Sequence, residues 1–169
     1  MVAPNGDIYV ADGHGAGTND RIVKFSKEGT FITAWGKHGK GPGEFDTLHG
    51  IALDSMGRVY VADRANNRIQ IFEPDGKFVS EWKQFGRPSD VAIDKNDMIY
   101  VADSQSTPSN NPGFKQGIRI GSVKDGKVTS FISAPDPGAP MPEGVTADKD
   151  GNVFGGFTEN NDVKKYVKN

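Results

Sequence analysis

Tyr60-Val-Ala-Asp63 is one of three identical tetrapeptides in this chain; the others are Tyr9-Val-Ala-Asp12 and Tyr100-Val-Ala-Asp103. A degenerate copy, Phe154-Gly-Gly-Phe157, follows near the end. The copies start 51, 40 and 54 residues apart, so the shortest unit has 40 residues and the longer ones carry loop insertions. A repeat of about 40 residues that is rich in short strands is typical of the blades of a β-propeller.

Three further segments recur around each copy, and each has four to six residues with β-branched and aromatic side chains. Such patterning, without helical periodicity, predicts strands. Asp-Gly pairs between them, as in Pro74-Asp-Gly76, favour tight hairpin turns. We therefore expect four antiparallel strands in a blade. The first segment precedes the tetrapeptide and covers 50–54, 90–94 and 144–148. The second follows the tetrapeptide and covers 21–25, 68–72 and 118–120. The third comes after the second and covers 31–35, 78–82 and 128–131.

The repeats predict an all-β chain of about three and a half four-stranded blades in a single propeller domain, residues 1–169. The expected blades are 1–47, 48–87, 88–141 and 142–169. The first starts at its second strand, and the last stops after its third. Closed propellers have about four to eight blades, and open sheets expose strand edges. We therefore expect a homodimer or another oligomer of this chain to complete the ring.

Composition limits the classes of partner. The net charge is −2 and the pI about 5.9, so no basic excess supports binding to nucleic acid. No apolar run approaches 18 residues, so we expect no membrane segment. The chain has no cysteine, which excludes disulfides and thiolate metal sites. It carries no signal peptide and reads as cytoplasmic as it stands, although an upstream signal would be missing if the chain starts inside a blade.

The strings Gly41-Pro-Gly-Glu-Phe45, His49-Gly-Ile-Ala-Leu-Asp54 and Gly57-Arg-Val-Tyr-Val-Ala-Asp63 resemble the NHL repeat, as does Arg64-Ala-Asn-Asn-Arg-Ile-Gln-Ile-Phe72. The resemblance implies a β-propeller, most often with six blades. Such propellers act as protein-binding, RNA-binding or catalytic modules, so the fold alone does not give the function.

One branch of that family is more similar. Asn19-Asp-Arg-Ile-Val-Lys-Phe25, Gly29-Thr-Phe-Ile-Thr-Ala-Trp-Gly36 and His49 resemble the lyase domain that converts peptidyl-α-hydroxyglycine into an amidated peptide and glyoxylate. That family uses zinc held by three histidines, a structural calcium, a tyrosine and an arginine. The resemblance places the first zinc histidine at His49, the arginine at Arg21 and a calcium-binding backbone carbonyl at Ile51.

The chain also departs from the lyase pattern. The second histidine position is Glu143, and the third lies beyond Asn169. The tyrosine would fall in the polar insertion 104–117, which contains none. We therefore predict a non-catalytic scaffold that recognises a protein or a small ligand on one propeller face. The alternative is a metal-dependent lyase or hydrolase, with zinc or calcium at a channel site around His49.

His49, Ser89 and Glu143 occupy the same place in successive blades, just before the innermost strand, so they should line one mouth of the central channel. His14 can approach them from the first blade. Imidazole and carboxylate groups bind divalent metals, so His14, His49 and Glu143 form a candidate metal site. The alternative is that His49 bonds to nearby backbone and that Glu143 is solvated.

Two other sets of residues recur and predict structural roles. Arg21 and Arg68 are equivalent, and each follows an aspartate at the end of the tetrapeptide, so an Asp–Arg pair should hold the turn between them. For Arg21 this reading competes with a catalytic one. Trp35, Trp82 and Phe131 recur on the last strand of each blade and should pack between blades.

Overall fold

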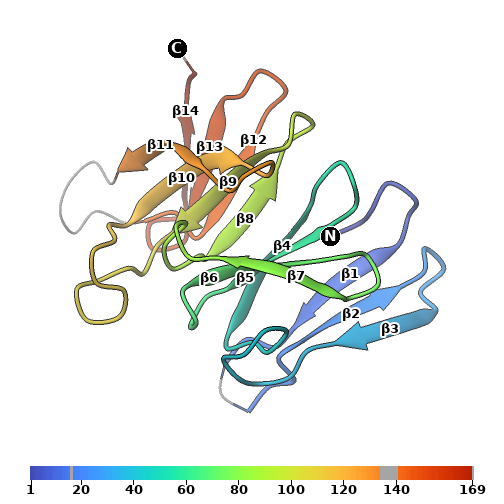
Figure 1. The fold of residues 1–169 in the computed structure, drawn as a ribbon. Coiled ribbons are helices and arrows are strands. Elements are labelled where there is room, and N and C mark those ends of the chain that lie inside the picture. Colours follow the sequence, from blue (N-terminus) through green and yellow to red (C-terminus); the bar gives the residue numbers. More distant parts are fainter. Residues whose placement is uncertain (16, 134–140, 169) are drawn as a thin grey trace.

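The computed structural model describes residues 1–15, 17–133 and 141–168. These residues form strands, turns and loops without a helix, and all strand pairings are antiparallel (Figure 1). None of them belongs to a helix of the length and apolar character needed to cross a membrane. The predicted all-β propeller segment is confirmed.

The first two sheets extend to residue 82. They consist of β1 (Ile8–Asp12), β2 (Arg21–Phe25) and β3 (Phe31–Trp35), and then of β4 (Leu48–Leu53), β5 (Val59–Asp63), β6 (Arg68–Phe72) and β7 (Phe78–Trp82).

The other two sheets follow in chain order. They consist of β8 (Asp90–Ile93), β9 (Met98–Asp103), β10 (Gly117–Ser122) and β11 (Val128–Ser133), and then of β12 (Gly144–Ala147), β13 (Val153–Phe157) and β14 (Asp162–Tyr166). The third strand of the third sheet is thus longer than the predicted 118–120.

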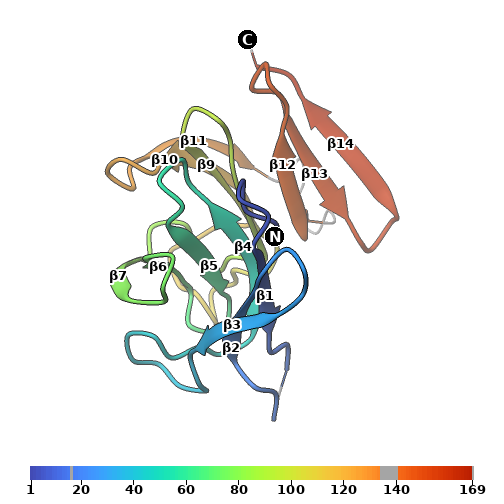
Figure 2. The ribbon, with the colours of Figure 1, turned by 90° about the vertical axis from the view of Figure 1, so that its right-hand side faces the viewer.

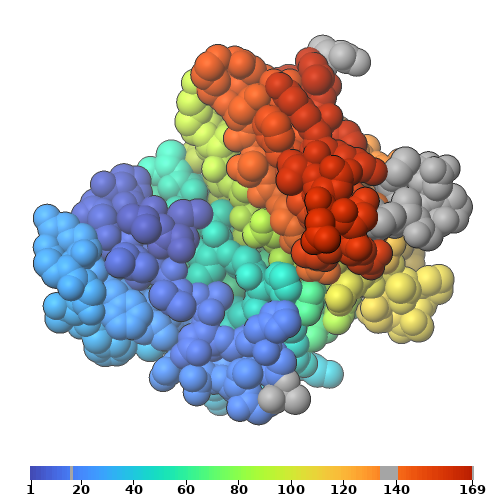
Figure 3. Space-filling view, turned by 180° about the vertical axis from the view of Figure 1, so that it is seen from behind, coloured from blue at the N-terminus to red at the C-terminus, as the bar shows by residue number. Residues whose placement is uncertain are grey.

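The sheets stand side by side, with β4 against β8 and β8 against β12 at the centre. Figure 2 shows the fourth sheet at one end of this arc and the first sheet at the other. Seen from behind, the first and fourth sheets flank the two middle ones (Figure 3). This is the arrangement of propeller blades around a channel.

The core consists of three apolar layers, each between two neighbouring sheets. The tetrapeptide in β5 serves two of them, because alternate side chains of a strand point to opposite faces. Val59 and Val61 face the first sheet, whereas Tyr60 and Ala62 face the third. All residues of β5 and β6 are buried. A strand covered on both faces reads as a continuous apolar run, which explains the Tyr-Val-Ala sequence.

Tryptophans on the last strands pack across to the next sheet, as predicted for two of the three aromatic positions. A Cβ on Gly76 would lie 2.7 Å from the Trp35 ring, and a Cβ on Gly126 would lie 2.7 Å from that of Trp82. Both glycines have a positive φ, 92° and 69°, so they provide the turn as well as the space.

The prediction for Phe131 was wrong by one residue. Trp35 pairs with Ile22 and Trp82 with Ile69, but the equivalent Ile118 pairs with Ile132. A slip of one residue exchanges the two faces of a strand. Phe131 therefore points away from the inter-sheet layer, and its ring lies 4.8 Å from the Arg119 guanidinium.

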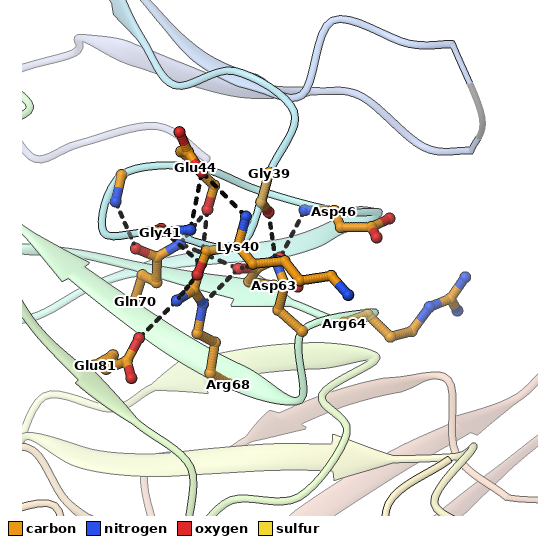
Figure 4. A network of polar contacts seen from close by, with 12 residues as sticks. Gly39, Lys40, Gly41, Glu44, Asp46, Asp63, Arg64, Arg68, Gln70 and Glu81 are labelled. Atoms are coloured by element: carbon orange, nitrogen blue, oxygen red, sulfur yellow. Dashed lines mark hydrogen bonds and ion pairs between the residues drawn. The ribbon is translucent and has the colours of Figure 1, made fainter. Parts of the chain in front are cut away.

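The predicted Asp–Arg pair is present and is buried in the second sheet. Arg68 Nε donates to Asp63 Oδ2 at 2.7 Å, and the two side chains are 4% and 0% exposed. Arg68 also donates to the carbonyl oxygens of Lys40, Gly41 and Glu44 (Figure 4). The pair thus holds the loop that leads from β3 to β4.

Asp63 is the centre of this network. Its carboxylate accepts hydrogen bonds from the Asp46 amide, Asn66 and Gln70 as well as from Arg68. Burial raises the pKa of Asp63, against these hydrogen bonds and the Arg68 charge, which lower it. The carboxylate is out of water, and the network compensates for its lost hydration.

The third sheet makes the same contact with another residue. Gly117 stands opposite Asp103, where an arginine stands in the first two sheets. Arg119, two residues further on the same face, reaches Asp103 Oδ2 at 2.9 Å. In the fourth sheet the two positions hold Phe157 and Asp162, so this pair is not formed there.

We predict that Asp63→Ala lowers the free energy of unfolding by about 3–5 kcal/mol, because it removes the buried acceptor of Arg68 Nε, Gln70 and the Asp46 amide and leaves Arg68 only the part-exposed Glu81 as an ion-pair partner. Urea denaturation measures this change. The matched control is Asp12→Ala, since the Asp12–Arg21 pair has a similar length, 2.8 Å, but side chains that are 34% and 45% exposed. There we expect a loss of no more than about 1 kcal/mol. Equal losses at the two sites would contradict this account.

Candidate functional site

The predicted mouth residues come together at the start of the inner strands. Glu143 contacts His49 directly, with its Oε2 3.7 Å from His49 Nε2. Its Oε1 accepts a hydrogen bond from Ser104 Oγ at 2.7 Å. The hydroxyls of Ser104 and Ser89 are 2.5 Å apart. A chain of polar contacts thus connects residues from three consecutive sheets.

Ser89 and Glu143 hold equivalent backbone positions. The Ser89 amide donates to the Ala102 carbonyl and the Glu143 amide to that of Gly156, at matching positions of β9 and β13. Each residue is thereby fixed as its inner strand begins, with its side chain at the mouth. The repeat itself therefore positions these side chains.

His14 joins this group from the loop after β1. Its ring centroid is 4.9 Å from that of His49, at an angle of 62° between the ring planes. Arg64, which the sequence analysis did not select, completes the group: Nη2 lies 3.2 Å from His14 Nε2 and Nη1 lies 3.6 Å from Glu143 Oε2. The guanidinium therefore lies between the histidine and the carboxylate.

Arg64 occupies the position directly after the tetrapeptide. The equivalent residues are Gly13, Ser104 and Thr158. The variation of this one position between repeats could have identified Arg64 from the sequence. It holds a different residue in each of the four sheets, whereas the strand before it is nearly constant in three.

Arg87 holds the backbone of Arg64 in place. Its Nη1 donates to the Arg64 carbonyl at 3.0 Å and to Asn67 Oδ1 at 3.1 Å. The Arg64 side chain is buried, and its Nε has no hydrogen-bond partner among the described residues. An unpaired buried donor is unfavourable by about 1–3 kcal/mol, so holding the guanidinium in this position carries a local free-energy penalty.

Burial lowers the pKa of His49, and the Arg64 charge lowers it further, whereas the Glu143 carboxylate raises it. Burial also lowers the pKa of Arg64, and Glu143 opposes this effect. An arginine stays protonated in proteins. The charged pair at the mouth is therefore Arg64 and Glu143, with His49 disposed to be neutral.

These residues do not fit the zinc site that the resemblance implies. Zinc sites of this kind need three protein ligands around one open volume. Here a permanent cation contacts both His14 and Glu143, and its N–H groups repel a metal ion. In the part of the chain that the structure describes, no group of three or more His, Cys, Asp or Glu side chains is arranged to hold a metal.

The calcium position at Ile51 has a similar difficulty. Ile51 and His49 line a hollow of about 300 Å³ with residues of the first sheet: Met1, Ile8, Tyr9, Val10 and Ala11. Calcium takes six to eight oxygen ligands, usually with carboxylates among them. No carboxylate lines this hollow, so its residues do not fit calcium.

Arg21 contacts Asp12 rather than the mouth group. Its Nε donates to Asp12 Oδ2 at 2.8 Å, and Asn19 donates to the same oxygen. The structural pairing expected for Arg21 is thus present, and its catalytic role stays a prediction.

A polar hollow of about 250 Å³ adjoins Glu143. It is lined by Ser104, Gln105, Gln116, Met141, Glu143, Thr158 and Glu159. The insertion 104–117 contributes one wall, because Gln116 Nε2 donates to the Ser104 carbonyl. The mouth thus offers hydroxyl, amide and carboxylate groups around an open space.

The NHL repeat family model matches residues 45–72, which include the buried Asp63–Arg68 pair and Arg64. Residues 45–72 of the chain form an NHL repeat.

This NHL-repeat chain is 45% identical over 82 residues to NHL repeat-containing protein 3 of Homo sapiens, covering 48% of this chain and 23% of that protein. It is 34% identical over 175 residues to peptidyl-glycine alpha-amidating monooxygenase of Mus musculus, covering 96% of this chain and 17% of that protein. The chain therefore spans less than a quarter of the length of either relative.

A solved structure with the same fold is virginiamycin B lyase from Staphylococcus aureus. It matches with a TM-score of 0.66 at 17% identity, over 98% of this chain and 53% of that one. At this identity the likeness shows the fold alone. The NHL-repeat chain corresponds to about half of that structure.

We predict opposite pKa changes at His49 for two mouth variants. Arg64→Gln should raise the pKa of His49, because it removes a repelling charge, and Glu143→Gln should lower it, because it removes an attracting one. NMR titration of the imidazole signals measures the shift, with His49 assigned by its loss in His49→Gln. Glu159→Gln is the control and should leave the value unchanged. Shifts of the same sign in both variants would contradict the proposed geometry.

Proposed function

We propose that this NHL-repeat chain is a non-catalytic binding scaffold that recognises a protein or a small ligand at the channel mouth, on one face of the propeller. One observation carries the proposal. Arg64 lies between His14 and Glu143, where a metal-dependent enzyme would need its ion. An internal cation in that place supports recognition by hydrogen bonds and charge rather than metal chemistry.

The groups around Arg64 suit ligand binding. The hydroxyl and amide groups that line the adjoining hollow can form hydrogen bonds with a ligand, and the Arg64 guanidinium adds a positive charge next to Glu143, which lines that hollow. Binding sites commonly combine a preformed hollow with a few oriented polar groups. Because the repeat fixes the backbone beneath them, little ordering is needed on binding, and this favours affinity.

The alternative is a metal-dependent lyase or hydrolase with its site around His49 and Arg21. It is favoured by the alignment with the amidating monooxygenase, which runs along 96% of this chain. It requires zinc or calcium ligands in addition to those of a single chain. Binding to nucleic acid is not expected at a net charge of −2.

A peptide library displayed on phage tests the binding proposal. Peptides selected on the immobilised chain should lose at least tenfold in affinity for Arg64→Ser, because the mouth loses its positive charge. Fluorescence polarisation measures the dissociation constants. The control is Arg58→Ser, at the opposite end of β5 from Arg64, and circular dichroism checks the fold of both variants. Selected peptides that are indifferent to Arg64→Ser would place recognition elsewhere and overturn the proposal.

A peptidyl-α-hydroxyglycine substrate tests the lyase alternative. With zinc added, we expect no more glyoxylate from the natural chain than from His49→Ala, since three imidazole ligands are not brought together. Zinc-dependent release of glyoxylate that disappears in His49→Ala would favour the enzyme over the scaffold.

A further inference from the structure

We propose that the insertion 104–117 recognises the main chain of a peptide ligand, with the side-chain amide of Gln105 as hydrogen-bond donor and that of Gln116 as acceptor. The inference rests on the proposed binding function of the mouth and assigns its ligand class. Both glutamines lie in the wall of the polar hollow beside Glu143.

The hydrogen bonds of Gln105 fix the orientation of its side-chain amide. Arg87 Nε lies 3.4 Å from Gln105 Oε1, and a guanidinium can only donate, so the contacting atom must be the oxygen. The NH₂ group of Gln105 makes no hydrogen bond with another described residue. It is therefore left as a donor at the wall of the hollow.

Gln116 has the opposite orientation. Its Nε2 donates to the Ser104 carbonyl at 2.8 Å, and a carbonyl can only accept, so the oxygen Oε1 is left for a ligand. An anion or a cation would match only one of the two glutamines. Each residue of a peptide main chain carries one N–H donor and one C=O acceptor, so an extended peptide matches both.

The insertion is tied to the second sheet by a closed circuit of hydrogen bonds. Arg87 Nη1 donates to Asn67 Oδ1 at 3.1 Å, and Asn67 Nδ2 donates to the Asn110 carbonyl at 2.8 Å. Asn110 Nδ2 donates to the Gln105 carbonyl at 2.8 Å, and Arg87 reaches the same glutamine through its Nε. The wall is therefore held in place before a ligand binds.

Asp103 fixes the start of the insertion. This carboxylate is fully buried and accepts hydrogen bonds from the backbone amides of Arg87, Gln105 and Ser106. A preformed wall needs little ordering on binding, and this favours affinity for a flexible peptide.

Arg87 connects this wall to the charged residue of the mouth. Its backbone amide binds the aspartate at the end of the tetrapeptide, as the amide of Asp46 does in the second sheet. There the turn after the aspartate is short, residues 64–67, and Asp46 has no guanidinium. Arg87 Nη1 also donates to the Arg64 carbonyl at 3.0 Å. One side chain thus positions both the insertion and Arg64.

An amide-to-ester scan tests recognition of the main chain. A peptide selected from the phage library on the natural chain is resynthesised with one N–H at a time replaced by an ester oxygen. One replacement should lower the affinity about fivefold, the effect of one neutral hydrogen bond. In Gln116→Met the same replacement should have no further effect, because its acceptor is already absent. Fluorescence polarisation measures the dissociation constants, and Gln105→Met should weaken the unmodified peptide about fivefold.

Hydrogen exchange measured by mass spectrometry tests the circuit without a ligand. Arg87→Gln and Asn67→Gly should each raise the exchange of 104–117 about fivefold, and the double variant little more, because either change opens the same circuit. Glycine is chosen because Asn67 has a positive φ of 54°. The control is Lys83→Gln in the same loop as Arg87, with a side chain that is 70% exposed, and it should leave the exchange unchanged. Equal exchange in Arg87→Gln and the natural chain would overturn the role of Arg87.

Failure of this inference differs from failure of the proposed function. Selected peptides that are indifferent to Arg64→Ser would overturn the proposed function. Peptides that depend on Arg64, but show no ester position coupled to Gln116→Met, would overturn main-chain recognition alone. So would unchanged binding of those peptides to Gln105→Met.

Discussion

The buried pair of Asp63 and Arg68 is the contact on which the described structure depends most. It joins β5 to β6 at 2.7 Å, and Arg68 holds the loop before β4 through three carbonyl oxygens. A buried charge is tolerated only when its hydrogen bonds are made. The requirement explains why the aspartate ends the tetrapeptide in three of its four copies, and why the third sheet supplies Arg119 where Gly117 cannot serve.

The same frame positions the functional residues. Arg64 directly follows Asp63, so the contact that fixes the end of β5 also fixes the start of the mouth. In the other sheets this place holds Gly13, Ser104 or Thr158. A constant strand followed by a variable residue lets the fold carry different chemistry in each blade. Arg64 and Glu143 come from different sheets, so their contact exists only because the sheets stand side by side.

Strands, turns and the Asp–Arg pair were predictable because they depend on residues close in the repeat. The spacing of Tyr-Val-Ala-Asp gave the blades, and the equivalence of His49, Ser89 and Glu143 gave the mouth. Two features were missed. Phe131 was aligned one residue too early, because the last strands of the first three sheets share the same bulge and the residue equivalent to Trp35 and Trp82 is Ile132. Arg64 was missed because its partners, His14 and Glu143, lie 50 and 79 positions away.

The central claim is that Arg64 provides the positive charge of the mouth in place of a metal ion. Metal content tests it most directly. The purified chain would be dialysed against zinc and calcium and then against metal-free buffer, and its content measured by inductively coupled plasma mass spectrometry. The account predicts much less than one ion of either metal in a chain. One ion retained in each chain, and lost in His49→Ala, would contradict it.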